Sequence, residues 1–185
     1  MTSRSPQRRI ALVAMLGIAS LGATASPASA LPLIGVGANV GVGVHIPSSG
    51  SLATDVTADL AIMGPVIGLQ WWRTLDGANT YLQGGLRFNV SPIPMVSVAP
   101  GIAAASFNGG LGGLGTLDAS FSPLMLPASL NAGVGYGYVN GSTLLPYHLG
   151  VKLSLIPFTA INVGYRGWQG GPNVGGPEIG IEVGL

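Results

Sequence analysis

Apolar side chains recur at every second residue through most of this chain, and that period limits the possible folds more than any other feature. In the segment 35–46, the even positions from Val36 to Ile46 hold valine, alanine or isoleucine, and the odd positions hold glycine, asparagine or histidine. Successive side chains of a strand point to opposite faces, so one face here is apolar and the other is small or polar. The pattern therefore predicts β-strands, and the 31 glycines of the chain disfavour helices.

The same alternation predicts ten strands. They span 35–46, 53–63, 65–75, 79–90, 95–106, 116–126, 129–140, 143–156, 158–168 and 177–185. Pro100, Pro123 and Pro146 fall inside three of them, and proline removes a donor from the ladder. We expect bulges or strand ends at these prolines.

The connections between these segments alternate in length. One set runs over Pro47–Leu52, Asp76–Ala78, Phe107–Gly115, Gly141–Ser142 and Gln169–Gly176; the other centres on Gly64, Ser91–Pro94, Pro127–Ala128 and Pro157. Outer-membrane barrels alternate longer outer loops with short periplasmic turns. The alternation favours ten strands over the alternative of eight, with both termini on the periplasmic side.

The N-terminal region has the pattern of a secretory signal peptide. Arg4, Arg8 and Arg9 precede the apolar run 10–21, and Ala28-Ser29-Ala30 supplies small residues for cleavage. We therefore expect residues 1–30 to be a cleaved signal peptide and residues 31–185 to form a single domain.

Charged residues are scarce in the mature region. Seven Lys and Arg minus the three in residues 1–30 leave four, and six Asp and Glu bring the total to ten charged residues. A soluble domain carries about a quarter of its residues charged. The surface of this domain is therefore expected to face lipid, which makes a transmembrane β-barrel the predicted fold, all-β, closed, antiparallel and up-and-down. No basic patch remains for nucleic acid, and the chain lacks cysteine for disulfides or thiolate metal sites.

In these features the chain resembles the small bacterial outer-membrane β-barrel proteins. Its last residues, 180–185, are similar to the C-terminal assembly signal of that class, with Gly180 and Val183, although Leu185 stands where the class usually ends in phenylalanine. The resemblance implies an outer-membrane location, contact with outer-membrane lipid, and recognition by barrel-assembly machinery during biogenesis. It does not indicate an oligomeric state.

The charged residues on the glycine-rich faces form the first candidate site. They are Asp59, Arg87, Asp118, Lys152, Arg166 and Glu182, with Asp55 near the outer rim. Three bases and three acids in one lumen either pair to stabilise the barrel interior or line a small permeation path. Both interpretations remain open from the sequence.

A second candidate set consists of aromatic residues near the outer strand ends. It comprises Trp71, Trp72, Tyr81, Tyr138, Tyr147 and Trp168. Amphipathic rings favour the headgroup level of a membrane, so we expect an outer aromatic girdle; the alternative is the ordinary enrichment of aromatics in strands.

Catalytic and metal sites have weak support in the sequence. Lipid A deacylases of this class use His-x-Ser, but Pro47 follows His45 at that spacing and Gly150 follows His148. The glycine-rich 109–113 lacks the Lys-Ser/Thr of a phosphate loop and is expected to be a loop only. We therefore predict no catalytic residue, no metal and no cofactor.

The predicted function is a non-enzymatic outer-membrane barrel, structural or weakly pore-forming. Three alternatives stay open: a rim-site enzyme acting on lipid, a secreted lipocalin-like barrel with apolar side chains inside, and an adhesin acting through its loops. The permeant, if any, is not indicated.

Overall fold

The computed structural model describes residues 36–47, 51–62, 65–123, 125–170 and 174–184. Within these ranges the secondary structure is all strand and turn. The strands are β1 (Val36–His45), β2 (Ala53–Ile62), β3 (Pro65–Thr74), β4 (Thr80–Phe88), β5 (Val90–Ile93), β6 (Val96–Phe107), β7 (Gly110–Phe121), β8 (Ala128–Val139), β9 (Ser142–Ile156), β10 (Thr159–Gln169) and β11 (Val174–Gly184). No helix long and apolar enough to cross a membrane is found among the described residues.

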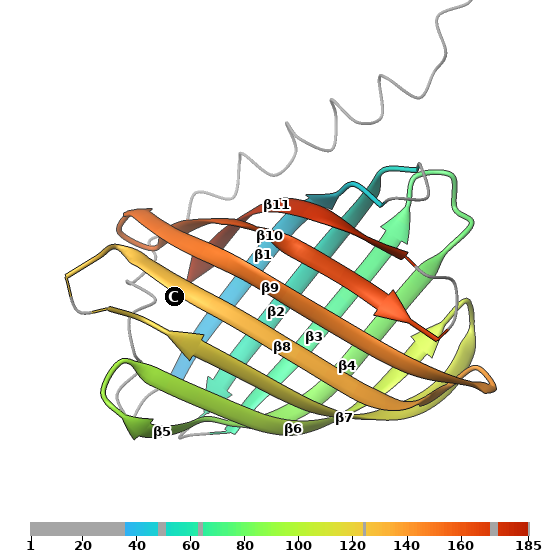
Figure 1. Ribbon diagram of the computed structural model, residues 1–185, viewed down its shortest axis with the longest axis horizontal. Coiled ribbons are helices and arrows are strands. Elements are labelled where there is room, and N and C mark those ends of the chain that lie inside the picture. The colour runs from blue at the N-terminus through green and yellow to red at the C-terminus, as the bar shows by residue number, and fades with distance from the viewer. Residues whose placement is uncertain (1–35, 48–50, 63–64, 124, 171–173, 185) are drawn as a thin grey trace, which may run out of the picture.

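The strands form one closed antiparallel barrel (Figure 1). Except for β4 and β5, each strand pairs with its neighbour in the chain; β1 also pairs with β11, and β4 pairs with β6. The short β5 continues β4 beyond Asn89 and also pairs with β6, so β4 and β5 together count as one strand of the barrel wall. The barrel wall therefore consists of ten strands, which confirms the predicted closed up-and-down barrel and excludes the alternative of eight strands.

The barrel has two distinct ends. β1 begins and β11 finishes at the same end, since Asn39 pairs with Gly184. We call this the terminal end, and we call the opposite end, with the β1–β2, β3–β4, β6–β7, β8–β9 and β10–β11 connections, the loop end.

Apolar side chains cover the outside of the barrel, and glycine or polar residues face inward. On β6, for example, Ile102 is 70% exposed, whereas the neighbouring Ala103 is buried. On β11, Ile179 and Ile181 are exposed. This arrangement is the reverse of a lipocalin-like barrel and excludes that alternative.

The prolines behave differently from one another. Pro123 lies beyond the end of β7, as expected. Pro100 and Pro146 stay inside β6 and β9 without a shift of register, so the expectation of a bulge or strand end was wrong for them. Proline has no N–H to donate, and each of these two prolines lies where pairing with one neighbouring strand is absent. Beside Pro100, the β4–β6 pairing stops at Arg87–Gly101. Beside Pro146, the β8–β9 pairing is interrupted.

The predicted loop Phe107–Gly115 is also wrong. β6 runs to Phe107, a tight turn of Asn108 and Gly109 with positive φ angles follows, and β7 starts at Gly110. Glycine at 112 indicates close strand approach here, because a Cβ on it would collide with the backbone carbonyl of Tyr138 on β8. The predicted loop Gln169–Gly176 is likewise shorter, since β11 begins at Val174.

The predicted signal peptide, residues 1–30, lies outside the described residues. Its cleavage and the resulting domain boundary stay predictions.

Candidate functional site: a polar lumen

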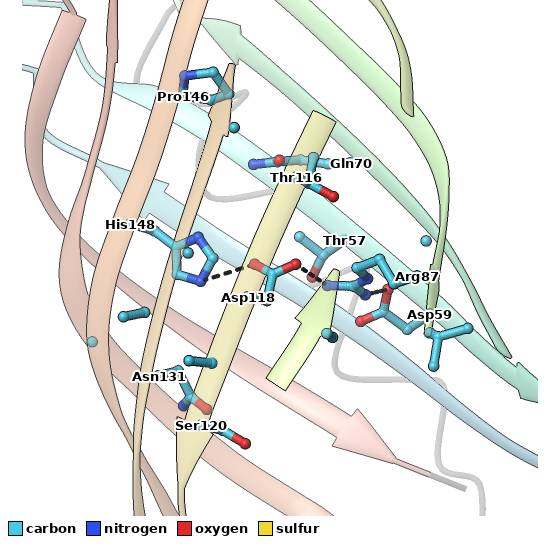
Figure 2. A pocket seen from close by; sticks show the side chains of 18 of the residues that line it. Thr57, Asp59, Gln70, Arg87, Thr116, Asp118, Ser120, Asn131, Pro146 and His148 are labelled. Atoms are coloured by element: carbon cyan, nitrogen blue, oxygen red, sulfur yellow. Dashed lines mark hydrogen bonds and ion pairs between the residues drawn. The ribbon is translucent and has the colours of Figure 1, made fainter. Parts of the chain in front are cut away.

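The barrel encloses a cavity of about 390 Å³. All six charged residues of the first candidate set line it, together with Glu178 and His148. They come from β2, β4, β7, β9, β10 and β11, because on each of these strands the inward positions hold the polar half of the alternation. Figure 2 shows part of this lining, with side chains from several strands directed into one space.

Arg87 joins two carboxylates across the lumen. It forms ion pairs with Asp59 on β2 and, at 3.2 Å, with Asp118 on β7 (Figure 2). The Nε2 atom of His148 lies 3.8 Å from the other oxygen of Asp118. The Arg87 guanidinium thereby connects β2, β4 and β7, and His148 on β9 approaches the same group through Asp118.

Arg166 has a similar position between two carboxylates. Its Nε donates to Glu178 at 2.5 Å and its Nη2 to the same carboxylate at 3.3 Å, a two-point contact. Asp55 approaches the guanidinium at 3.7 Å. Arg166 and Glu178 are on neighbouring strands, whereas Asp55 comes from β2 on the other side of β1.

A third contact lies nearer the terminal end. Lys152 pairs with Glu182, and Asn162 donates to the second oxygen of Glu182 at 3.1 Å. These contacts join β9, β10 and β11. The three groups together give the lumen five carboxylates and three bases.

Glu178 was not in the predicted set, although the alternation identifies it. It shares parity with Gly180 and Glu182 on β11, and its side chain binds Arg166. The neighbouring Pro177 places it near the start of the predicted strand, where the alternation has few residues to establish a face.

A cluster of aromatic side chains fills the lumen toward the loop end. We define this aromatic cluster as His45, Trp72, Tyr81 and Trp168. His45, Trp72 and Tyr81 are fully buried, and Trp168 is 3% exposed. The Trp72 and Trp168 ring centroids are 4.8 Å apart, and the Trp72 indole N–H donates to His45 Nδ1 at 3.2 Å.

Apolar residues surround the aromatic cluster and complete a layer across the barrel. They are Ala53, Ala103, Ala105, Phe107, Leu114, Val139, Leu144 and Val174. When His45 on β1 is included, each of the ten strands of the barrel wall contributes a side chain to this layer. The lumen is therefore polar in its middle and closed by packed side chains toward the loop end.

This arrangement corrects half of the predicted aromatic girdle. Trp72, Tyr81 and Trp168 do not face outward. Each shares parity with an inward polar residue of its own strand: Gln70, Gln83 and Arg166, respectively. The prediction that these rings lie near the strand ends was correct, but the predicted outward face was wrong. A large ring packed inside the end of a narrow lumen has more of its apolar surface removed from water than a ring placed on the outer face at the headgroup level.

The other half of the predicted girdle lies on the outer face. Trp71 and Tyr138 are exposed, and Tyr147 stacks against Tyr165 with ring centroids 6.3 Å apart. Tyr136 and Tyr165 are also exposed and were missed by the sequence analysis. Both share parity with outward apolar residues of their strands.

Neither histidine forms a recognisable catalytic or metal site. His45 is enclosed by Trp72 and Trp168, and His148 contacts only Asp118 among the described charged groups. In the described part of the chain, no three metal-ligating side chains converge. Of the predicted assembly signal, Gly180 and Val183 lie in β11 and Leu185 lies outside the described residues.

Comparison with known proteins places the fold. No family model and no curated protein sequence matches the chain. Among solved structures, the KdgM porin is similar with a TM-score of 0.52 at 6% identity, over 78% of this chain and 98% of that one. The NanC porin gives a TM-score of 0.51 at 8% identity, over 80% and 99%. The chain therefore has the fold of the bacterial outer-membrane β-barrel porins.

Proposed function

We propose that this protein is a non-enzymatic outer-membrane β-barrel whose lumen is closed at rest. The observation that carries this proposal is the aromatic cluster, which occupies the loop end of an otherwise polar interior. The barrel has a structural role in the envelope and conducts only when the aromatic cluster rearranges.

Membrane insertion is supported by the exterior of the barrel. Leu69, Ile102 and Leu149 are among many large apolar side chains that are more than half exposed. In water such a surface promotes aggregation, whereas in a bilayer it is the ordinary lipid-facing surface of a closed barrel. Closure also pairs each of the long strands, β1–β4 and β6–β11, with a neighbour on both sides, as hydrocarbon requires.

We place the loop end outside the cell and the terminal end in the periplasm. This orientation follows from the predicted signal peptide and from the resemblance to outer-membrane barrels, whose termini are periplasmic. On the same resemblance, the partners are outer-membrane lipid and, during biogenesis, the barrel-assembly machinery.

A non-enzymatic role is supported by the surroundings of the two histidines. His45 Nδ1 accepts a hydrogen bond from Trp72, and its ring is fully buried, so neither a lipid nor a water-soluble substrate reaches it. His148 faces Asp118 within the lumen, with no serine among its polar contacts in the described residues.

Planar-bilayer recording of the refolded protein tests the closed lumen. The wild type is expected to give rare, small openings, and the double variant Trp72→Ala, Trp168→Ala is expected to give sustained conductance, because two indoles are removed from the closed layer. Trp71→Ala is the matched control: it removes the neighbouring indole from the outer face and leaves conductance at the wild-type level.

Two results would contradict the proposal. The first is a wild-type protein that conducts steadily without further change. The second is a double variant that folds, shown by heat-dependent migration on unboiled gels, and yet stays as silent as the wild type.

A further inference from the structure

The connections at the two ends of the barrel differ in composition. At the loop end, the β6–β7 and β8–β9 turns are both Asn-Gly, and the β3–β4 connection carries Asp76. The described connections at the terminal end span 94–95, 122–127 and 157–158. Apart from Ser122 they consist of proline and large apolar residues, and none of them carries a charge.

Most apolar side chains of the terminal-end connections are exposed. Met125 is 95% exposed and Leu126 62%. Met95 is also exposed, and so are Ile93 and Ile156, each of which precedes the proline of a turn. Contact of such side chains with water is unfavourable, so these connections favour an apolar environment.

Two of these turns place a bulky side chain where a hairpin normally uses glycine or asparagine. Met95 and Phe158 each follow proline in a two-residue turn, and both have a φ angle of 75°. A positive φ angle is costly for a bulky residue. A large apolar side chain retained at such a position indicates a role outside the folding of the turn itself.

Hydrogen bonds hold these turns in place. The Met95 carbonyl accepts from the Ser122 N–H at 2.8 Å, and the Phe158 carbonyl accepts from the Gly184 N–H at 2.9 Å. Each turn is thereby fixed to a neighbouring part of the barrel. We call the ordered apolar side chains at this end the apolar rim, which consists of Ile93, Met95, Met125, Leu126, Ile156 and the half-buried Phe158.

The apolar rim is continuous with the apolar exterior of the barrel. Phe88 on β4, Phe121 on β7 and Leu155 on β9 are exposed next to it. No charged residue occurs in the segments 88–96, 121–128 and 155–159, which contain these side chains and the rim. The surface that the proposed function assigns to lipid therefore extends into the connections.

We propose that the apolar rim inserts into the periplasm-facing leaflet of the membrane and anchors the terminal end there. The rim side chains contact acyl chains, and the turn backbone stays at the headgroup level, where water satisfies its polar groups. The partner is lipid, recognised through burial of apolar surface. This inference rests on the membrane location and orientation given under the proposed function.

Quenching of a fluorescent label tests this placement. The chain has no cysteine, so single cysteines in place of Met125, Asn140 and Ile102 each carry one nitrobenzoxadiazole label. The folded mature protein is placed in phosphatidylcholine nanodiscs, in which both faces of the bilayer are open to water. Iodide reports contact with water, and a nitroxide on the acyl chain near the headgroup reports contact with lipid.

The label at 125 is expected to be quenched strongly by the lipid nitroxide and weakly by iodide, and the label at 140 to show the reverse. Iodide quenching at 125 equal to that at 140 would overturn the proposal. Protection at 125 from both quenchers would also overturn it, because a protein surface, such as a second copy of the chain, would then cover the rim.

A double variant tests the rim side chains themselves. Met95→Asn with Leu126→Asn removes two of them, and asparagine tolerates the positive φ angle at position 95. The label at 125 is expected to lose most of its lipid quenching and to become accessible to iodide. Leu75→Asn is the matched control, since it removes an exposed apolar side chain from the loop end. Unchanged quenching in the double variant, or an equal loss in the control, would contradict anchoring by the rim.

The label at 102 separates this inference from the proposed function. Ile102 lies on the barrel exterior, away from both sets of connections. If lipid does not quench the label at 102, the proposed membrane location fails. If lipid quenches the label at 102 and not the label at 125, the anchoring inference alone fails.

Discussion

At the scale of single residues, the two lumen arginines are the centres of the ion-pair groups. Arg166 is the more enclosed of the two, with its side chain 15% exposed, and it contacts Glu178 at two points. Removing it leaves Glu178 and Asp55 together in the lumen without a base. Breaking a buried pair from one side is strongly destabilising because the remaining charge is uncompensated.

Arg166→Met is therefore expected to lower the free energy of unfolding by about 3–5 kcal/mol. Urea denaturation in detergent, followed by tryptophan fluorescence, measures it. Arg73→Met is the control, since Arg73 is exposed near the end of β3; its effect is expected to stay within about 0.5 kcal/mol. Equal effects of the two substitutions would mean that the lumen pairs do not stabilise the barrel.

At the scale of strands, glycine has different roles along one element. On β7, a Cβ at position 112 would collide with the carbonyl of Tyr138, whereas a Cβ at position 115 would lie 3.9 Å from the carbonyl of Tyr136. The first glycine permits close approach of β7 and β8. The second occupies open space on the outer face.

Gly112→Ala is expected to destabilise the barrel by about 1–3 kcal/mol, as overpacking does, because the backbones of β7 and β8 must separate. Gly115→Ala, on the same strand, is expected to be neutral or slightly stabilising, since alanine restricts the unfolded chain. Urea midpoints of the two variants check this difference. A neutral Gly112→Ala would show that the two strands are not held at close approach.

The strands also show what the sequence could and could not predict. β1 and β2 were located closely, because their alternation is long and regular. β7 was partly missed, because the run 109–113 resembles a loop when glycine is taken as flexible rather than as a requirement for close packing. Trp72 lies two residues from the lumen-lining Gln70, so the two-residue period predicts its inward face, whereas the membrane preference of tryptophan predicts the outer face. The pairing of Arg166 with Glu178 depends on strand order and register, which a single sequence does not specify.

At the scale of the whole molecule, two opposite solvents determine the structure. In the proposed membrane location lipid surrounds the apolar exterior, and the lumen holds the charges and glycines, with packed side chains closing it toward the loop end. Apart from the short β5, the strands contribute to both surfaces through the same two-residue period. Neighbouring residues of one strand therefore face different media.

Site-directed spin labelling of β3 tests whether its neighbouring residues face different media. The chain has no cysteine of its own, so single cysteines at consecutive positions from Ile67 to Trp72 carry the label without background. In lipid bilayers, labels at 67, 69 and 71 are expected to be highly accessible to oxygen dissolved in the membrane, and labels at 68, 70 and 72 to be much less so. Accessibility that does not alternate, or that alternates with the opposite phase, would contradict the barrel as described.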